Sequence, residues 1–474
     1  MIDKAMINKD RFISRRDLLR TAGGGIGSLA LADLLRAEGL QRVSPLAVQQ
    51  PHFAAKAKAV ISIFCYGGVS QVDTFDPKPE LLKRQGETIP GKTIQVSQGT
   101  PGGLMPSSWQ FKKHGQCGMD VSSLFPHVAT KVDEIALIRS MYCISNDHAP
   151  ALYQMNTGFI QAGHPSMGSW LTYGLGSENQ NLPGFVVFAD WRGGPIGGAP
   201  NWSNGFMPAA YQGTPFRSSG DPIVDLKPPT EMTPERQQRW LRLLGQLNEE
   251  HQAKNPEDTE LAARIRSYEL AYQMQSSAVE AVELTKESAA TRALYGLDEK
   301  PTEYVGRQCL MARRLVERGV RFVQIYSGGG NFTESWDAHF DLELNHGMHC
   351  AETDKPIAGL LTDLKSRGLL DSTLVIWHGE FGRMPISQRL NGRDHNPQGF
   401  SVWMAGGGVK GGTIHGATDE YGLNAVENRT SVNDLHATIL HLMGMNHEKL
   451  TYPYNGRNMR LTDVSGSVIK EVLA

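Results

Sequence analysis

Buried strands that alternate with glycine-terminated helices are the feature that most limits how this chain folds. Residues 59–65 (AVISIFC) are a continuous apolar, β-branched run, which is typical of a strand buried on both faces of a sheet. A helical pattern over residues 307–319 ends in glycine and leads directly into a second such run at 320–326. The same order recurs in the amphipathic helix at 354–368 and the strand at 373–377. This alternation predicts an α/β fold with a large, mainly parallel sheet and helices on both faces.

Three further apolar runs extend the predicted sheet, at residues 135–141, 182–188 and 400–405. The chain has 474 residues, of which 40% are apolar, so it can bury a sizeable core. We expect one large domain over residues 51–474, since α/β domains often reach this size.

A helical insertion is predicted at about residues 230–300. Residues 237–250 and 259–285 contain many charges and no proline, and their spacing is helical. We expect two or three long helices here, packed on the sheet or inserted beside it.

The N-terminus carries a twin-arginine export pattern. Ser14-Arg15-Arg16 is followed by a mildly apolar stretch at residues 21–35, which is too short and too glycine-rich to span a bilayer. The alternative is a basic helix start that contains Arg-Arg by chance. We interpret residues 1–50 as a signal and linker, which places the mature protein in the periplasm or outside the cell. The export machinery is then a partner, and it carries folded proteins, often with a cofactor already bound.

The overall charge and the cysteines exclude some classes of protein. Lys and Arg number 47 against 49 Asp and Glu, a net charge of −2, so neither nucleic acid nor an anionic membrane is expected as a partner. The five cysteines are scattered and form no C-x-x-C pair, so neither a disulfide framework nor a zinc-thiolate knuckle is indicated. No other run is apolar for about 18 residues, so no membrane span is expected in the mature protein.

Acidic, histidine and arginine side chains adjoin several of the predicted strands. In parallel sheets the carboxyl ends of the strands meet at one edge, where ligands bind. Histidines and carboxylates gathered at such an edge suit a divalent metal such as zinc, manganese or calcium. Each of these side chains taken alone is more often a surface or core residue. The candidates are Asp73, Asn146, Asp147, His148, Asp337, His339, His378, Glu380, Arg383, Arg393, Asp394, His395 and Asn396.

Several motifs resemble the sulfatases and phosphatases of the alkaline phosphatase superfamily. Residues 373–382 (TLVIWHGEFG) are similar to the sulfatase strand that ends in Ser-Asp-His-Gly or Ser-Asp-Asn-Gly, and residues 431–444 and 455–459 resemble their C-terminal helix and the short segment after it. Together with Trp336-Asp-x-His and Gly392-Arg-Asp-His-Asn, these motifs identify the chain as a member of the family known as domain of unknown function 1501. The resemblance covers about residues 14–465. It implies a three-layer sandwich and one or two divalent ions.

The resemblance implies one complete metal position, formed by Asp337, His339 and His395. Asp394, beside His395, is a further candidate ligand. At the second position Glu380 stands where the superfamily has Asp, and Phe381 stands where it has His or Asn. Phenylalanine cannot bind a metal, so the resemblance implies a second position that is weakened or re-formed.

The position of the sulfatase nucleophile is occupied by a histidine. Residues 148–158 align with the sulfatase Cys-x-Pro-Ser-Arg stretch, and His148 takes the place of the cysteine that becomes formylglycine. Formylglycine chemistry is therefore excluded at this position. Three alternatives remain: His148 is a nucleophile or a metal ligand, water activated by the metal attacks directly, or the site has decayed.

Three further residues are candidates, one for the second metal position and two for substrate binding. Asp73 could replace the acid that usually ends the first strand, although it comes several residues later. Arg383 and Arg393 would suit an anionic ester, because a guanidinium pairs bidentately with sulfate or phosphate; surface ion pairs are the alternative. His346 and His349 could share a helix face, and we expect them to face solvent.

The sequence thus predicts an exported metal-dependent hydrolase of sulfate or phosphate esters, including esters on polysaccharides. The alternative is a non-catalytic envelope or glycan-binding protein on a decayed hydrolase scaffold. The two hypotheses differ in whether the acids and histidines converge at metal distance or are dispersed and salt-bridged.

Overall fold

The strand β1 (Ala59–Cys65) lies inside a nine-stranded sheet and is buried along its whole length. In this computed structural model the strand order is β14-β5-β13-β9-β1-β8-β6-β7, with β17 also paired to β5. The other strands of the sheet are β5 (Ile135–Tyr142), β6 (Phe185–Phe188), β7 (Thr214–Phe216), β8 (Phe322–Ser327), β9 (Thr373–His378), β13 (Phe400–Ala405), β14 (Thr413–His415) and β17 (Thr430–Ser431). The structure describes residues 46–474 except 92, 95, 98–99, 180, 218–222, 224–230, 255–273, 275–279 and 331–333.

The sheet is mainly parallel, as predicted. β1 runs parallel to β8 and β9, and β6 runs parallel to β7 and β8. β13 is antiparallel to both of its neighbours, β5 and β9. The start of β13 therefore lies at the edge of the sheet where β5, β8 and β9 end.

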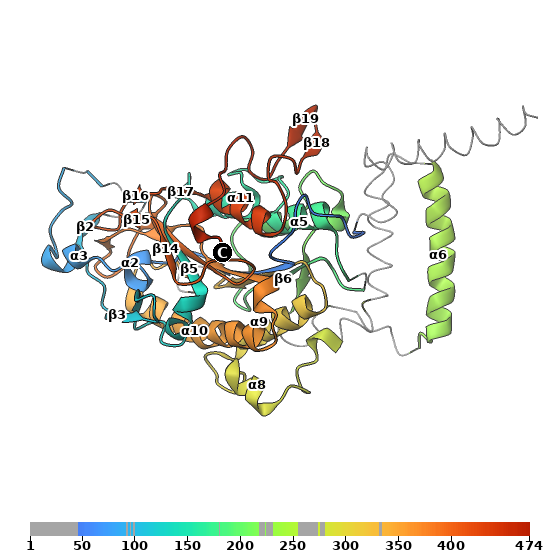
Figure 1. Ribbon diagram of the computed structural model, residues 1–474, viewed down its shortest axis with the longest axis horizontal. Coiled ribbons are helices and arrows are strands. Elements are labelled where there is room, and N and C mark those ends of the chain that lie inside the picture. The colour runs from blue at the N-terminus through green and yellow to red at the C-terminus, as the bar shows by residue number, and fades with distance from the viewer. Residues whose placement is uncertain are drawn as a thin grey trace, which may run out of the picture.

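Helices cover both faces of the sheet (Figure 1). The side chains of β1 alternate between two buried apolar clusters, with Ile61 and Ile63 in one and Val60 and Phe64 in the other. Among the residues that the structure describes, two long helices contribute side chains to the first cluster and three helices to the second, so the fold has three layers. The helices of the first cluster are α9 (Glu303–Glu317) and α10 (Leu342–Ser366), and those of the second are α4 (His148–Thr157), α5 (Met167–Leu175) and α11 (Val432–Leu442).

The helix α10 begins earlier than the sequence pattern predicts. It starts at Leu342 instead of residue 354, so His346 and His349 lie inside it. Both histidines are fully buried, and the prediction that they face solvent is wrong. The polar composition of residues 342–353 hides the helix, because several of its side chains bind loops. Asn345 and His349 bond to the carbonyl oxygen of Ser335 in the loop after β8, and His346 accepts from the backbone N–H of Ser70.

Short elements lie outside the main sheet. The ribbons are β2 (Pro101–Leu104) with β11 (Ile386–Gln388), β3 (Phe111–His114) with β4 (Met119–Ser122), β10 (Gly382–Arg383) with β12 (His395–Asn396), β15 (Ala417–Thr418) with β16 (Ala425–Glu427), and β18 (Tyr452–Tyr454) with β19 (Arg457–Met459). The short helices α2 (Gln71–Thr74) and α3 (Pro79–Lys83) follow β1, and α8 (Ala289–Leu294) precedes α9.

Part of the predicted helical insertion is described. The helix α6 (Pro234–Lys254) covers the first predicted helical segment, 237–250, and Figure 1 draws it to one side of the sheet. Most of the second segment, 259–285, lies outside the described residues, as do residues 1–45 with the predicted twin-arginine motif. Among the helices that the structure describes, none has the length and apolarity that crossing a bilayer requires.

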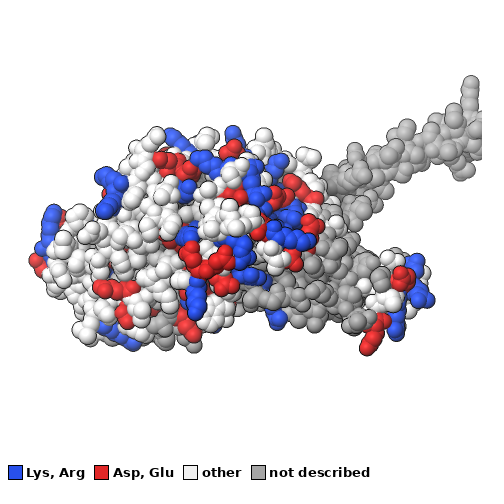
Figure 2. Space-filling view, turned by 90° about the horizontal axis from the view of Figure 1, so that it is seen from below, with Lys and Arg blue, Asp and Glu red and all other residues white. Residues whose placement is uncertain are grey.

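The face that carries α9 and α10 mixes charges of both signs. Figure 2 shows acidic and basic side chains interspersed over it, with several close to one another. Ion pairs such as Lys365–Glu134 (2.6 Å) and Arg367–Asp363 (2.7 Å) belong to this face.

Candidate metal centre

Four side chains that could hold a metal come from loops at one edge of the sheet. Asp337 and His339 lie between β8 and α10, His148 is the first residue of α4 after β5, and His395 lies in β12, shortly before β13. The pairing of β10 with β12 places Arg383 directly opposite His395. The sheet topology therefore brings together residues that are up to 247 positions apart, between 148 and 395.

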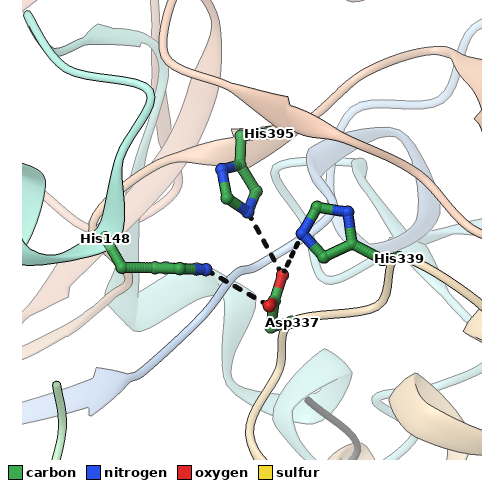
Figure 3. Close-up of side chains that lie close together, drawn as sticks. All are labelled: His148, Asp337, His339 and His395. Atoms are coloured by element: carbon green, nitrogen blue, oxygen red, sulfur yellow. Dashed lines mark hydrogen bonds and ion pairs between the residues drawn. The ribbon is translucent and has the colours of Figure 1, made fainter. Parts of the chain in front are cut away.

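The carboxylate of Asp337 is the centre of this group (Figure 3). Its Oδ1 lies 3.0 Å from Nε2 of His339 and 3.2 Å from Nε2 of His395, and its Oδ2 lies 3.3 Å from Nε2 of His148. The four potential ligand atoms all lie within 4.8 Å of one another. Ligand atoms about 2.0–2.1 Å from a tetrahedral zinc ion are about 3.3 Å apart, so the spacing fits a metal.

The other ring nitrogen of each histidine is held by an acceptor. Nδ1 of His148 lies 2.7 Å from Oε1 of Glu380, and Nδ1 of His395 lies 2.6 Å from the carbonyl oxygen of Asn146. A carboxylate and a carbonyl only accept, so both Nδ1 atoms carry the hydrogen. A neutral ring then presents the lone pair of Nε2 to Asp337. Metal-binding histidines typically have their second nitrogen anchored in this way.

His339 has a corresponding contact. Its Nδ1 lies 2.6 Å from Oε1 of Gln388 and 3.6 Å from a carboxylate oxygen of Asp394. Three Nε2 atoms and a carboxylate thus converge on one point. Without additional protons, their lone pairs repel one another, and a cation would relieve that repulsion. Nε2 of His148 is buried, and it faces Oδ2 of Asp337 at 3.3 Å.

A buried arginine keeps Asp337 ionised. One guanidinium nitrogen of Arg383 lies 2.6 Å from Oδ1 of Asp337 and also donates to the carbonyl oxygen of Gly67. Burial alone would raise the pKa of Asp337, but Arg383 and hydrogen bonds from the three histidines hold that pKa well below its usual range. The carboxylate is therefore ionised at neutral pH.

Two of the histidines have pKa values displaced in opposite directions. Burial lowers the pKa of His148, but hydrogen bonds and charge attraction from Asp337 and Glu380 outweigh it and raise the pKa to about 9. Burial lowers the pKa of His395 to about 4, although its hydrogen bond to Asp337 acts in the opposite direction. In the metal-free chain His148 therefore carries the extra proton, which a metal would displace.

Residues 57–473 match the family described as "Protein of unknown function (DUF1501)". The chain belongs to this family. No curated protein sequence matches the chain.

The solved structures similar to this DUF1501 chain are distant. The lipoteichoic acid synthase LtaP from Listeria monocytogenes is 10% identical, with 90% of this chain and 80% of that chain covered and a TM-score of 0.37. The PsFucS1 sulfatase from Pseudoalteromonas sp. is 13% identical, with 90% and 72% covered and a TM-score of 0.35. A mutant of the TAB5 alkaline phosphatase is 11% identical, with 84% and 100% covered and a TM-score of 0.35. These values are too low to transfer site residues or an activity.

Glu380 lies behind His148 and is not one of the four converging groups. It is fully buried, and both of its oxygens accept from the backbone N–H of Gly67, at 3.0 and 3.1 Å. Gly67 has a φ of +96°, and a Cβ there would lie 2.7 Å from the backbone nitrogen of Asp337. Only glycine therefore fits at position 67, between Glu380 and Asp337. This contact explains the first glycine of the Gly-Gly sequence after β1.

Asp73, Arg393 and Asp394, three further predicted site residues, also lie outside the converging group. Asp73 forms a fully buried ion pair with Arg393, with 2.7 Å between Oδ2 and Nε. Arg393 also donates to the carbonyl oxygen of Met105 at 2.9 Å, and its side chain is inaccessible to a substrate. Asp394 accepts from Oγ of Ser97 at 2.5 Å and lies behind His339.

Phe381 and the buried His349, for which the sequence predicted no supporting role, also contact the residues of the centre or of its loops. The ring of Phe381 stacks on His395, with centroids 4.5 Å apart, and lies 5.0 Å from the ring of His148. His349 makes a hydrogen bond of 2.9 Å to the carbonyl oxygen of Ser335, in the loop that carries Asp337. Phe381 adjoins the Gly-Glu motif of the sequence, but only the fold shows that its ring packs against two ligands.

An open hollow of about 650 Å³ leads to the centre from the side of His395. Asn146, which anchors His395 through its carbonyl oxygen, also lines it. The remaining described lining residues are Thr93, Ile94, Ile144, Met384, Asn396, Pro397, Gln398, Leu423 and Asn424. A substrate in this hollow would reach the His395 side of the centre.

Proposed function

We propose that this chain is an exported, metal-dependent hydrolase of sulfate or phosphate esters, including esters carried on polysaccharides. The observation that carries the proposal is the convergence of His148, Asp337, His339 and His395 on one point, with ligand atoms within 4.8 Å of one another. The resemblance of the sequence to sulfatases and phosphatases supports the choice of substrate class.

The donor set favours one ion, and zinc over the other candidate metals. Three imidazole nitrogens and one carboxylate oxygen suit zinc, and manganese less well, whereas calcium prefers six to eight oxygen ligands. Glu380 and Asp73 were candidates for a second ion. Glu380 already accepts from His148 and Gly67, and Asp73 is paired with Arg393.

His148 suits the role of a metal ligand better than that of a nucleophile. Its Nδ1 donates to Glu380, and its Nε2 is directed at Asp337. A divalent cation at this centre would polarise an ester oxygen and lower the pKa of water towards neutrality, so no covalent nucleophile is required. Phe381 packs against His148 and His395 and excludes water from that side.

The two arginines serve the proposed centre indirectly. Arg383 is fully buried and binds Asp337, and Arg393 is fully buried and binds Asp73. Neither presents a free guanidinium to an anionic ester. Arg383 instead keeps Asp337 charged and fixed in place, which a ligand carboxylate requires.

The alternative, a non-catalytic envelope or glycan-binding protein on a decayed scaffold, predicts dispersed or salt-bridged ligands. The ion pair between Arg383 and Asp337 fits that alternative. The convergence of three imidazole nitrogens on the same carboxylate favours the hydrolase.

The test is metal content by elemental mass spectrometry of the purified protein, followed by hydrolysis of 4-nitrophenyl sulfate and phosphate. We expect about one equivalent of a divalent metal, lost in His339→Ala/His395→Ala and kept in the control His447→Ala, whose residue lies outside the centre. Folded protein that takes up no zinc, manganese or calcium would sink the proposal. Metal-loaded protein without ester hydrolysis would favour the alternative, a binding protein.

Export is tested by fractionation of cells that express the chain. The double variant Arg15→Lys/Arg16→Lys should block export.

A further inference from the structure

Arg192, in the loop after β6, is a buried arginine outside the converging group, and its side chain is 6% exposed. Its Nε and Nη2 donate to the two carboxylate oxygens of Asp190, at 2.8 and 2.9 Å. Its Nη1 and Nη2 donate to the two oxygens of Glu352 on α10, at 3.2 and 2.8 Å. The planar guanidinium therefore joins two carboxylates from different elements, each through a bidentate contact.

Asp190 holds the start of the loop that carries two of the proposed metal ligands. Its Oδ2 accepts from the backbone N–H of Gly328 at 2.9 Å. Gly328 is the first residue after β8, and the loop that begins there leads to Asp337 and His339. Through Asp190, Arg192 thus fixes the point at which this loop leaves the sheet.

Glu352 acts on the other end of the same loop. Its Oε2 lies 3.4 Å from Nδ1 of His349, one turn earlier on α10. Nε2 of His349 donates to the carbonyl oxygen of Ser335 at 2.9 Å, and its ring stacks on Trp336 with centroids 5.1 Å apart. Ser335 and Trp336 directly precede Asp337. The His349 ring therefore sets the position of the backbone from which the ligand carboxylate projects.

We propose that Arg192 is a positioning residue for Asp337. The inference rests on the proposed function, because it assigns a role towards a ligand of the proposed metal centre. Arg383 binds the carboxylate of Asp337 itself, whereas Arg192 holds both ends of the loop behind it. Without the guanidinium, Asp190 and Glu352 are two buried carboxylates that have lost their shared partner, so both anchors of the loop are weakened.

The test compares Arg192→Met with the matched control Arg313→Met in the full-length chain. Arg313 is also buried, with a side chain 3% exposed, and it binds Glu287 at 3.1 Å and Asp363, in the last turn of α10, at 3.0 Å. Both variants should lower the melting temperature. Only Arg192→Met should weaken zinc binding, by about 10- to 100-fold, because it alone displaces a ligand. Competition with a chromophoric chelator measures the affinity, and the visible absorption spectrum of bound cobalt(II) reports the ligand geometry.

Two further variants test how Arg192 acts. Arg192→Lys keeps the charge but cannot bind two carboxylates bidentately, so it should restore part of the zinc affinity and of the cobalt spectrum. It also replaces Arg192→Met if that variant does not fold. Because Arg192 acts partly through Glu352, Arg192→Met and Glu352→Gln together should weaken zinc binding by less than the product of their separate effects.

The ring ¹⁵N resonances of the histidines in the metal-free chain distinguish this inference from the proposed function. The three rings that contact Asp337 should change their resonances in Arg192→Met and keep them in Arg313→Met, whether or not the wild type binds a metal. Such changes in a wild-type chain that takes up no zinc would contradict the metal centre and still support the positioning role. The proposal is overturned if Arg192→Met matches Arg313→Met in zinc affinity, cobalt spectrum and histidine resonances.

Discussion

At the scale of single residues, the second nitrogen of each histidine determines what the centre can hold. His148 is oriented by Glu380, whose carboxylate is fully buried and lies 2.7 Å from Nδ1. Replacing Glu380 with Gln keeps the shape but removes the charge, so Nδ1–H is held less firmly and Nε2 is a weaker ligand. We predict that Glu380→Gln still binds zinc, with an affinity about 10- to 100-fold lower. Competition with a chromophoric chelator measures this.

The matched control is Glu287→Gln. Glu287 is a partly buried carboxylate in an ion pair, with Arg313 at 3.1 Å, and it lies outside the converging group. Its variant should bind zinc as the wild type does. Complete loss of metal in Glu380→Gln would instead make Glu380 a ligand, as the sequence prediction had it, and equal affinity in both variants would contradict its orienting role.

The sequence predicted which residues approach each other better than it predicted their roles. Asp337, His339 and His395 follow or precede strands whose ends meet at one edge, so their convergence could be expected from topology. The environment of each side chain could not. Whether Arg393 meets solvent or Asp73, and whether His346 is exposed, depends on loops whose path has no periodic signal. Those side chains are buried because the loops fold over them.

At the scale of elements, apolar runs were the reliable signal. β1 and β13 have the predicted bounds, because strands buried on both faces are continuous apolar segments. The antiparallel direction of β13 is set by its pairing with β5 and β9, which no local pattern encodes. The early start of α10 was missed for a related reason, since its first turns have no apolar stripe.

The contact between the β11–β12 loop and the loop after β8 gives an element-scale prediction. A Cβ on Gly392 would lie 2.0 Å from the carbonyl oxygen of His339, so Gly392→Ala must push these loops apart. Because His339 and His395 flank this contact, we expect loss of most metal binding together with a lower melting temperature. Elemental analysis and thermal unfolding measure the two effects.

A second variant tests whether any glycine-to-alanine change would cause the same loss of metal binding and stability. Gly347 lies within α10, and a Cβ there would meet nothing within 4 Å. Gly347→Ala should therefore keep its metal and gain about 0.5–1 kcal/mol of stability from helix propensity. Metal binding by Gly392→Ala at the wild-type level would show that the loops yield without moving His339.

At the scale of the whole molecule, buried neutral histidines make stability depend on pH. Burial lowers the pKa of His346 and His378 to about 3 and that of His436 to about 4. In the unfolded chain the pKa is about 6.5. Below that pH the unfolded chain binds protons that the folded chain does not. The stability from these three groups is therefore complete above about pH 6.5 and falls as the pH approaches 4.

Each such histidine contributes a slope of up to about 1.4 kcal/mol per pH unit, so the three together contribute about 4 kcal/mol per unit. We predict that His436→Gln lowers the dependence of the unfolding free energy on pH, between pH 6 and 5, by about 1.4 kcal/mol per pH unit. This is the contribution of one proton. Nε2 of His436 bonds to the carbonyl oxygen of Met155 at 2.9 Å, a contact that the glutamine amide can replace without titrating. Urea unfolding of metal-free protein measures the slope, and groups shared with the wild type cancel in the difference. An unchanged slope would mean that His436 is protonated in the folded chain, against its complete burial.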